Sequence, residues 1–294
     1  MEDKSAGFQF TGIGTSWCVL IDGEVLDKDT REKILDYVQV FDNRFSRFIN
    51  TSEASSFRNS PAGKYPLSSE FALILKRADE LRELTSGLSD PAVGALLELA
   101  GYDSDYSMSP KADLKNFVLP KWQLDGETLE LDRGAVFDIG GMGKGYLIDK
   151  IAEILEKNGY RHYMVDGGGD IFATTKSDGS PWRVAIEYPG KPDMAAGVVE
   201  LKNQGLAVSD TFRRRWGNWH HIVHPVLKTP VESVLGVAAV SGNAWDADSA
   251  TSALFFADED KYSAVADAFG ASYLVFKSDG RTRVSKNWKG ELFV

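Results

Sequence analysis

Residues 138–146, DIGGMGKGY, concentrate four glycines between two different periodic patterns. Before them, residues 129–137 first alternate apolar and polar side chains and then become apolar, which predicts a strand that enters a core. After them, Ile148, Ile151 and Leu155 recur at helical spacing, and Gly159 ends the pattern as a C-terminal cap. The chain is therefore expected to run from a strand through a glycine-rich turn into a helix.

Such a turn can bind an anion. The first N–H groups of a helix have no partner within it and lie at the positive end of its dipole, so they favour a phosphate or pyrophosphate. Asp138, just before the turn, can only accept hydrogen bonds and suits a ribose, an amine or a metal-bound water. A purely structural turn is the alternative.

Two common nucleotide motifs are excluded at this turn. Lys144 is followed by Gly145 and not by Ser or Thr, so the segment is not a P-loop. The glycines lack the order of a Rossmann fingerprint, and residues 165–170, VDGGGD, stand where that fingerprint would have a charged strand end.

Charge and cysteine content narrow the function classes. The chain has 294 residues, 43% of them hydrophobic, and a net charge of −10, which argues against a general nucleic-acid surface. The basic cluster Arg213–Arg215 is interpreted as a solvated edge. The single cysteine, Cys18, excludes an internal disulfide framework and a cysteine zinc site.

The sequence carries no membrane or export signal. No run of 18 apolar residues is present, so no transmembrane span is expected. Residues 1–12 lack the basic and apolar regions of a signal peptide. The sequence as given predicts a cytoplasmic protein, although an exported form whose leader had been removed would look the same.

Turn and cap signals organise the rest of the chain. Asp22–Gly23 and Asp125–Gly126 predict hairpin turns, the first after a strand pattern in residues 8–21 that Gly12 and Gly14 interrupt. Helices are expected to begin with Thr30 and Ser69 as N-caps. Asp90 is expected to cap a further helix with Pro91 at its first position. The alternation of strands and helices is too irregular for a doubly wound parallel sheet, so we predict an α+β protein.

Three of the four histidines lie in residues 219–225, WHHIVHP. If this segment is extended, His220 and His224 face one way and His221 the other. A zinc site could use His220 and His224, but no third ligand is apparent. We favour an acid, base or charge donor near a phosphate.

Residues 245–256, WDADSATSALFF, form the second late cluster. Asp248 and Ser252 are four residues apart, hence on one face of a helix. One carboxylate and one hydroxyl, with backbone carbonyls and phosphate oxygens, suit Mg²⁺. The alternative is that Asp248 caps this helix and Ser252 merely faces inward.

Taken together, these segments resemble the ApbE family of flavin transferases, which move FMN from FAD onto a protein threonine or serine. The resemblance extends from about residue 12 to the C-terminus, and its landmarks appear in family order. They are Phe45–Ser46 with residues 52–59, residues 90–94 (DPAVG), 138–146, 167–170 (GGGD), 208–215, 220–222 and 248–254.

The chain departs from the family pattern at several positions. His224 replaces an Asp, and the turn after it, residues 226–228, is altered. Ser252 stands for the metal-helix Thr, Ile13 for a Met, and Asp210 for a Gly. The family's lipoprotein signal is missing.

The resemblance implies a site and a fold. Mg²⁺ would be held by Asp248, Ser252 and a backbone carbonyl of the Gly141–Gly143 turn, assigned to Gly143. FAD would contact Ile13, Asp90, Asp138, Gly141, Lys144 and His221. The fold would be a T-fold-like, mixed and largely antiparallel sheet with flanking helices and an inserted helical lobe at roughly 60–120, all in one domain of two intimately packed lobes spanning 1–294.

The implied reaction is Mg²⁺-dependent transfer of FMN from FAD to an exposed Thr or Ser of an acceptor flavoprotein, with release of AMP. Asp248 would hold the metal, and His221 would transfer a proton or stabilise a phosphate oxygen. Two alternatives stay open: an Mg²⁺-dependent FAD pyrophosphatase that yields FMN and AMP, and a non-catalytic FAD-binding protein.

Overall fold

The computed structural model describes residues 7–111 and 114–293. The chain divides into two compact units. Unit 1 is formed by Met1–Val40, Met142–Asp210 and Ser233–Val294, and unit 2 by Phe41–Gly141 and Thr211–Glu232.

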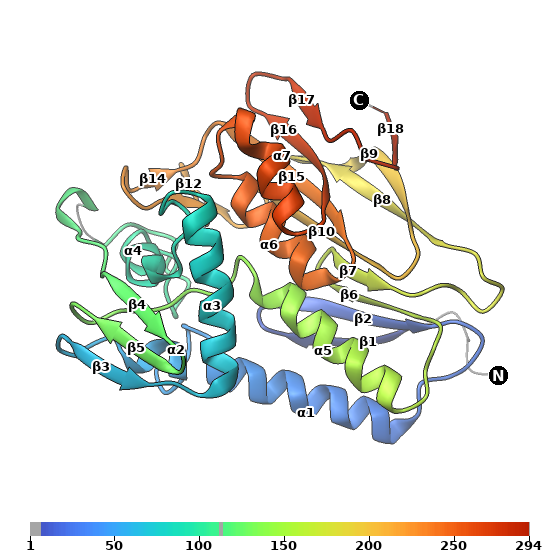
Figure 1. Cartoon of the computed structure of the whole chain (residues 1–294), viewed down its shortest axis with the longest axis horizontal. Helices are drawn as coiled ribbons and strands as arrows, with labels where there is room; N and C mark the ends of the chain where they lie inside the picture. Colours follow the sequence, from blue (N-terminus) through green and yellow to red (C-terminus); the bar gives the residue numbers. More distant parts are fainter. Residues whose placement is uncertain (1–6, 112–113, 294) are drawn as a thin grey trace. The chain divides into compact units, whose positions relative to one another are not determined.

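An eight-stranded sheet in the order β1-β2-β6-β7-β10-β15-β16-β17 is the framework of unit 1 (Figure 1). All of these neighbours pair antiparallel, which confirms the expected α+β architecture with a largely antiparallel sheet. The strands are Phe8–Gly12, Thr15–Ile21, Tyr163–Gly167, Asp170–Ala173, Gln204–Asp210, Val234–Ser241, Ser272–Lys277 and Thr282–Val284.

Both faces of this sheet are covered. Helices α5 (Gly143–Lys157) and α6 (Ala244–Leu254) pack against each other and against its central strands, and α7 (Tyr262–Ala268) follows η3 (Glu259–Lys261) and packs on α6 (Figure 1). A second sheet of β8 (Trp182–Tyr188), β9 (Lys191–Leu201) and β18 (Glu291–Leu292) shares a buried core with β7, β10, β15 and β16. α5 and α6 are therefore held on one side of a fully packed sheet.

Unit 2 combines short helices with small sheets. The helical elements are α2 (Glu53–Ser56), α3 (Ser69–Leu84), η1 (Pro91–Val93), α4 (Gly94–Leu99) and η2 (Leu114–Asn116). The sheets are β3-β5-β4 (Gly63–Pro66, Thr128–Leu131, Trp122–Asp125), β11-β12 (Arg215–Trp216, Trp219–His220) and β13-β14 (Val223–His224, Thr229–Pro230). Helix α1 (Lys28–Phe45) runs from unit 1 into unit 2.

Several predicted boundaries were wrong. Residues 132–137 are not part of a regular strand, because β5 ends at Leu131. Their N–H groups bond to α2 and its C-cap instead: Phe137 N donates to Ala54 O at 3.1 Å and Ala135 N to Phe57 O at 3.0 Å. The hairpin predicted through Asp125–Gly126 is confirmed as β4–β5.

Two predicted caps are displaced, and one predicted hairpin is absent. β2 pairs with β1 through the turn at Ile13–Gly14, and Asp22–Gly23 leads towards α1 rather than into a hairpin. Thr30 lies inside α1, where its backbone N–H donates to Asp27 Oδ1 at 2.9 Å, so the acceptor at this end is Asp27. The N-cap of α3 is Ser68 and not Ser69. In the described part of the chain no helix is long and apolar enough to cross a membrane.

Candidate functional site

The predicted turn-to-helix segment is confirmed, and its first N–H groups meet a carboxylate. α5 begins at Gly143 after Met142, whose side chain makes no capping hydrogen bond. Gly145 N donates to Asp248 Oδ2 of α6 at 2.9 Å. Since the start of a helix carries partial positive charge, the buried Asp248 carboxylate stabilises it. One N–H group that was expected to meet a phosphate is thus bound by the protein itself.

A second carboxylate makes the reciprocal contact. Asp149 of α5 accepts hydrogen bonds from Ala244 N at 2.9 Å and Trp245 N at 3.0 Å, at the start of α6. Burial raises the pKa of Asp149 to about 6, against the lowering effect of these two N–H groups. Asp248 of α6 therefore accepts a hydrogen bond at the start of α5, and Asp149 of α5 accepts two at the start of α6. The N-cap of α6 is Asn243, so the alternative that Asp248 caps this helix was wrong.

Gly145 permits this close approach. A Cβ added at this position would lie 2.4 Å from Ala244 O, 2.7 Å from Asp248 Cβ and 2.8 Å from Trp245 Cα. These distances are below any real carbon contact, and two of the three atoms belong to backbone. The glycine is therefore required by the contact between α5 and α6.

Lys144 lies between two buried carboxylates. Its ammonium forms an ion pair with Asp170, which is 0% exposed, and lies 4.0 Å from Asp248 Oδ1, whose side chain is 1% exposed. Asp170 is itself fixed by Val208 N, which donates to its other oxygen at 3.0 Å. The Lys144 ammonium therefore lies beside two buried carboxylates at the start of α5.

The donor set at this point fits Mg²⁺ by chemical type. Asp248 and Ser252 lie one turn apart on α6, and Gly143 is buried at the start of α5, whose Gly145 N–H bonds Asp248. Carboxylate, hydroxyl and carbonyl oxygens are the ligands that Mg²⁺ accepts, usually with substrate oxygens completing the shell. Within residues 7–111 and 114–293, no group of three His, Cys, Asp or Glu side chains is arranged around a metal position.

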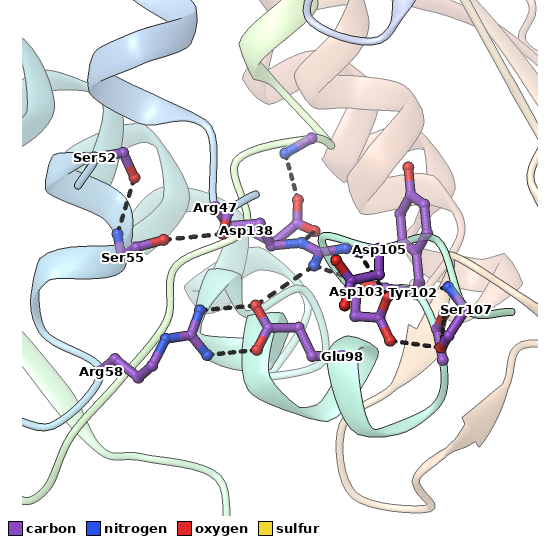
Figure 2. A network of polar contacts seen from close by, with 12 residues as sticks. Arg47, Ser52, Ser55, Arg58, Glu98, Tyr102, Asp103, Asp105, Ser107 and Asp138 are labelled. Atoms are coloured by element: carbon purple, nitrogen blue, oxygen red, sulfur yellow. Dashed lines mark hydrogen bonds and ion pairs between the residues drawn. The ribbon is translucent and has the colours of Figure 1, made fainter. Parts of the chain in front are cut away.

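Asp138 belongs to unit 2, where a buried arginine binds it (Figure 2). Arg47 Nε donates to Asp138 Oδ2 at 2.5 Å, and Gly140 N donates to Asp138 Oδ1 at 2.7 Å. Burial opposes the carboxylate charge, but Arg47, the Gly140 N–H and Arg214 together hold its pKa below the usual range. Asp138 is therefore an ionised acceptor that orients the first peptide of the glycine-rich turn.

The structure joins Asp138 to the Asp90 turn. Asp138 N donates to Pro91 O at 2.7 Å. Asp90 caps η1 as expected, accepting from Ala92 N at 2.8 Å, and it also accepts from Trp122 Nε1 at 2.9 Å. Burial raises the pKa of Asp90, against the effect of these donors. Asp90, Asp138 and the adjoining Gly141 thus lie in one hydrogen-bonded part of unit 2.

The histidines do not lie on one extended strand. His220 ends β12 and His224 ends β13, in different sheets, so the single extended strand on which a shared face would depend is not formed. Burial lowers the pKa of His220, and its neutral ring donates from Nε2 to Val231 O at 2.9 Å. His221 is half-buried between the two strands, and its N–H donates to Arg214 O at 3.3 Å.

His224, which stands where the family pattern has an Asp, accepts hydrogen bonds that an Asp could also accept. Its Nδ1 accepts from Val226 N at 3.2 Å and Leu227 N at 3.1 Å, so the ring caps the turn that follows. An aspartate at the start of a turn bonds the same two N–H groups. The replacement therefore preserves the turn by another side chain.

Ile13 lies in unit 1 at the turn between β1 and β2. Its φ is +43°, a left-handed conformation that is uncommon for a β-branched residue. The peptide at Ile13 is thereby held in a left-handed turn geometry.

The sequence analysis did not identify several charged residues that bond to, or act electrostatically on, the predicted site and its helices. Asp149 was not singled out, and Asp170 was identified only as part of the 167–170 landmark and not as a partner of Lys144. Arg47, in the FSRF stretch, was not singled out. Arg214 was assigned to a solvated edge, yet it is half-buried and its charge acts on Asp138. A charged residue within an apolar run, such as Arg47 between Phe45 and Phe48, was the signal that could have found one of them.

The chain is similar to one family of known proteins over most of its length. The sequence profile described as the ApbE family matches residues 13–275. The chain belongs to the ApbE family. A Haemophilus influenzae protein named FAD:protein FMN transferase is 29% identical over 95% of this chain and 88% of its own length. A protein of the same name from Escherichia coli K12 is 25% identical over 80% of this chain and 74% of its own length.

Solved ApbE structures share the fold. The ApbE protein of Thermotoga maritima superposes with a TM-score of 0.83, at 23% identity, over 95% of this chain and 96% of that one. The flavin transferase ApbE of Vibrio cholerae gives a TM-score of 0.79, also at 23% identity, over 95% of this chain and 96% of that one. At this identity the likeness establishes the ApbE fold alone.

Proposed function

We propose that this protein transfers FMN from FAD to a threonine or serine hydroxyl of an acceptor flavoprotein, in an Mg²⁺-dependent reaction that releases AMP. Relatives from Haemophilus influenzae and Escherichia coli bear the name FAD:protein FMN transferase. The observation that carries the proposal is the contact between two family landmarks, in which Gly145 N of α5 bonds the buried Asp248 of α6. A helix start, a lysine and a carboxylate with oxygen neighbours suit a metal-bound pyrophosphate.

In this proposal Mg²⁺ would be held by Asp248, Ser252 and the Gly143 carbonyl. When bound, it neutralises charge that develops on the pyrophosphate oxygens. Lys144 contributes a second positive charge, and Asp170 restrains its ammonium from the other side. Asp248 thus combines two tasks, since one oxygen also fixes the start of α5.

The remaining predicted residues would bind FAD. The backbone at Ile13 and Gly141, the Asp90 turn, Asp138 and His221 would contact the dinucleotide. The acceptor hydroxyl oxygen forms a bond to the FMN phosphorus, and the bond from that phosphorus to the AMP oxygen breaks, so that AMP leaves with the electron pair. His221 accepts the hydroxyl proton or donates to a phosphate oxygen.

The test follows AMP release and flavin fluorescence of the acceptor on a denaturing gel together, with FAD, with and without Mg²⁺. Asp248→Asn should abolish both signals and weaken Mg²⁺ binding in calorimetry, whereas Ser249→Ala, next to it on α6, should keep Mg²⁺ binding. A folded His221→Ala protein that binds FAD and transfers FMN at the parent rate would remove His221 from the reaction. AMP with only free FMN would favour a pyrophosphatase, and tight FAD without AMP a binding protein.

A further inference from the structure

Arg47 is a charged residue in the interior of unit 2. Its side chain is 2% exposed. Nε donates to Asp138 Oδ2 at 2.5 Å and Nη1 donates to Tyr102 O at 2.8 Å (Figure 2). The guanidinium also lies over the rings of Phe48, at 4.1 Å, and Tyr102, at 4.7 Å. Burying a cation is costly, so a position that keeps one is held by paired charge and by function.

The geometry of the guanidinium favours Asp138 over its other acidic neighbour. Glu98 lies 3.9 Å from Nη1, and Arg58 binds both Glu98 oxygens, at 2.5 and 2.9 Å. Asp138, in contrast, accepts directly from Arg47. Arg47 Nη2 is buried without a hydrogen-bond partner among the described residues. In this orientation Nε bonds Asp138, while Nη2 makes no hydrogen bond with the described residues.

Hydrogen bonds of Asp138 connect Arg47 to the glycine-rich turn. Asp138 Oδ1 accepts from Gly140 N at 2.7 Å, and Asp138 N donates to Pro91 O at 2.7 Å. The Asp138 carboxylate thus fixes the Gly140 N–H, and the Asp138 N–H is in turn fixed by the Asp90–Pro91 turn. Both turns carry residues proposed to contact FAD.

We propose that Arg47 is a positioning residue for flavin transfer: it holds Asp138 in the orientation and charge state that keep the 138–141 turn shaped for FAD. The inference rests on the proposed function and names a residue that acts through Asp138. A purely structural arginine would stabilise unit 2 and leave FAD affinity unchanged at every pH at which the protein is folded.

The surrounding charges give the two roles different pH dependence. Arg47, Arg214, Glu98 and Tyr102 are the charged and titratable groups around Asp138. Burial raises the pKa of Asp138, and Arg47 is the largest opposing charge. Replacing Arg47 by methionine leaves burial in place with only the Gly140 N–H and Arg214 against it. The carboxyl then takes up a proton as pH falls, and its hold on the Gly140 N–H weakens.

The experiment measures FAD dissociation constants by flavin fluorescence, without acceptor, from about pH 5 to about pH 8. Relative to the parent at the same pH, Arg47→Met should lose at least about tenfold more FAD affinity at the acidic end than at the neutral end, since each pH unit below a pKa removes tenfold of the charged form. Arg47→Met with Asp138→Asn removes both charges, and its affinity should be weaker than the parent's by the same factor at every pH.

Arg44→Met is the matched control. Arg44 lies in the last turn of α1, three residues before Arg47, and has the same kinds of partner: the Glu70 carboxylate, Ser68 Oγ at 3.0 Å and the Phe45 ring at 4.5 Å. It should lose stability and keep the parent's FAD affinity at every pH. If Arg47→Met does not fold, Arg47→Lys takes its place: its acidic loss should be smaller because Lys keeps the positive charge, but not zero because Lys cannot make both of the arginine's hydrogen bonds.

Carboxyl ¹³C NMR separates failure of this inference from failure of the proposed function. Asp138, assigned by its absence in Asp138→Asn, should titrate at higher pH in Arg47→Met than in the parent. A parent that does not bind FAD would refute the proposed function, while the Asp138 titration would still test the Arg47 interaction. Arg47 variants that titrate like the parent, or lose affinity equally at all pH values, would overturn the inference.

Discussion

Gly145 offers the sharpest test of how α5 and α6 are held together. Gly145→Ala places a methyl group 2.4 Å from Ala244 O and 2.8 Å from Trp245 Cα, and backbone atoms cannot rotate away. Overpacking of this kind costs about 1–3 kcal/mol. The shift also stretches the 2.9 Å bond from Gly145 N to the Asp248 carboxylate, a class of bond that contributes about 1.5–3 kcal/mol.

Helix propensity opposes these losses, since alanine gains about 1 kcal/mol over glycine inside a helix. The net expectation is a loss of about 2–4 kcal/mol in the free energy of unfolding, measured by urea titration. Gly242→Ala is the control, because a Cβ there meets no atom within 4 Å and the φ is not positive. It should change stability by less than about 1 kcal/mol, in the stabilising direction. Equal stability of the two variants would refute the required close approach of α5 and α6.

Three further predictions follow from the same contacts. The pKa of Asp149 is about 6 in the folded state, against an ordinary value of 3.8. Between these two pH values the folded state keeps a proton that the unfolded state has lost, so the parent's free energy of unfolding falls as pH rises. Asp149→Asn should therefore gain stability relative to the parent, by about 2–3 kcal/mol between pH 4 and 7 in urea titrations; a constant difference would contradict the raised pKa. His224→Asp should keep the stability of the parent and His224→Ala should lose about 1 kcal/mol, because only the former accepts from the turn N–H groups; equal unfolding midpoints for both would exclude the cap. Ser68→Ala should lose about 1–2 kcal/mol by thermal unfolding, since Ser68 Oγ caps α3, whereas Ser69→Ala should be nearly neutral.

Local signals in the sequence predicted the elements that carry the site. The helical spacing of Ile148, Ile151 and Leu155 predicted α5, and glycine chemistry predicted the turn before it, because both are decided by residues close in the chain. The cap at Asp90 with Pro91 was confirmed for the same reason. Family landmarks added Asp248 and Ser252, which periodicity alone could place on one helix face.

Long-range contacts could not be predicted in this way. Arg47 and Asp138 are 91 residues apart, and Gly145 and Asp248 are 103 residues apart. No period or spacing connects such pairs, and their partners are chosen by tertiary packing. The same applies to the end of the predicted strand: Ala135, Val136 and Phe137 are buried, but the N–H groups of Ala135 and Phe137 bond to the C-cap of α2 and to α2 instead of a sheet.

The most direct test of flavin transfer is the intact mass of an acceptor protein after incubation with this protein, FAD and Mg²⁺. The account predicts one added FMN, less a water, on a single threonine or serine, with one AMP released for each acceptor modified. It also predicts no added mass with Asp248→Asn. An acceptor of unchanged mass, across several flavoproteins with exposed hydroxyls, while AMP accumulates from FAD, would contradict the account and assign the protein to FAD hydrolysis.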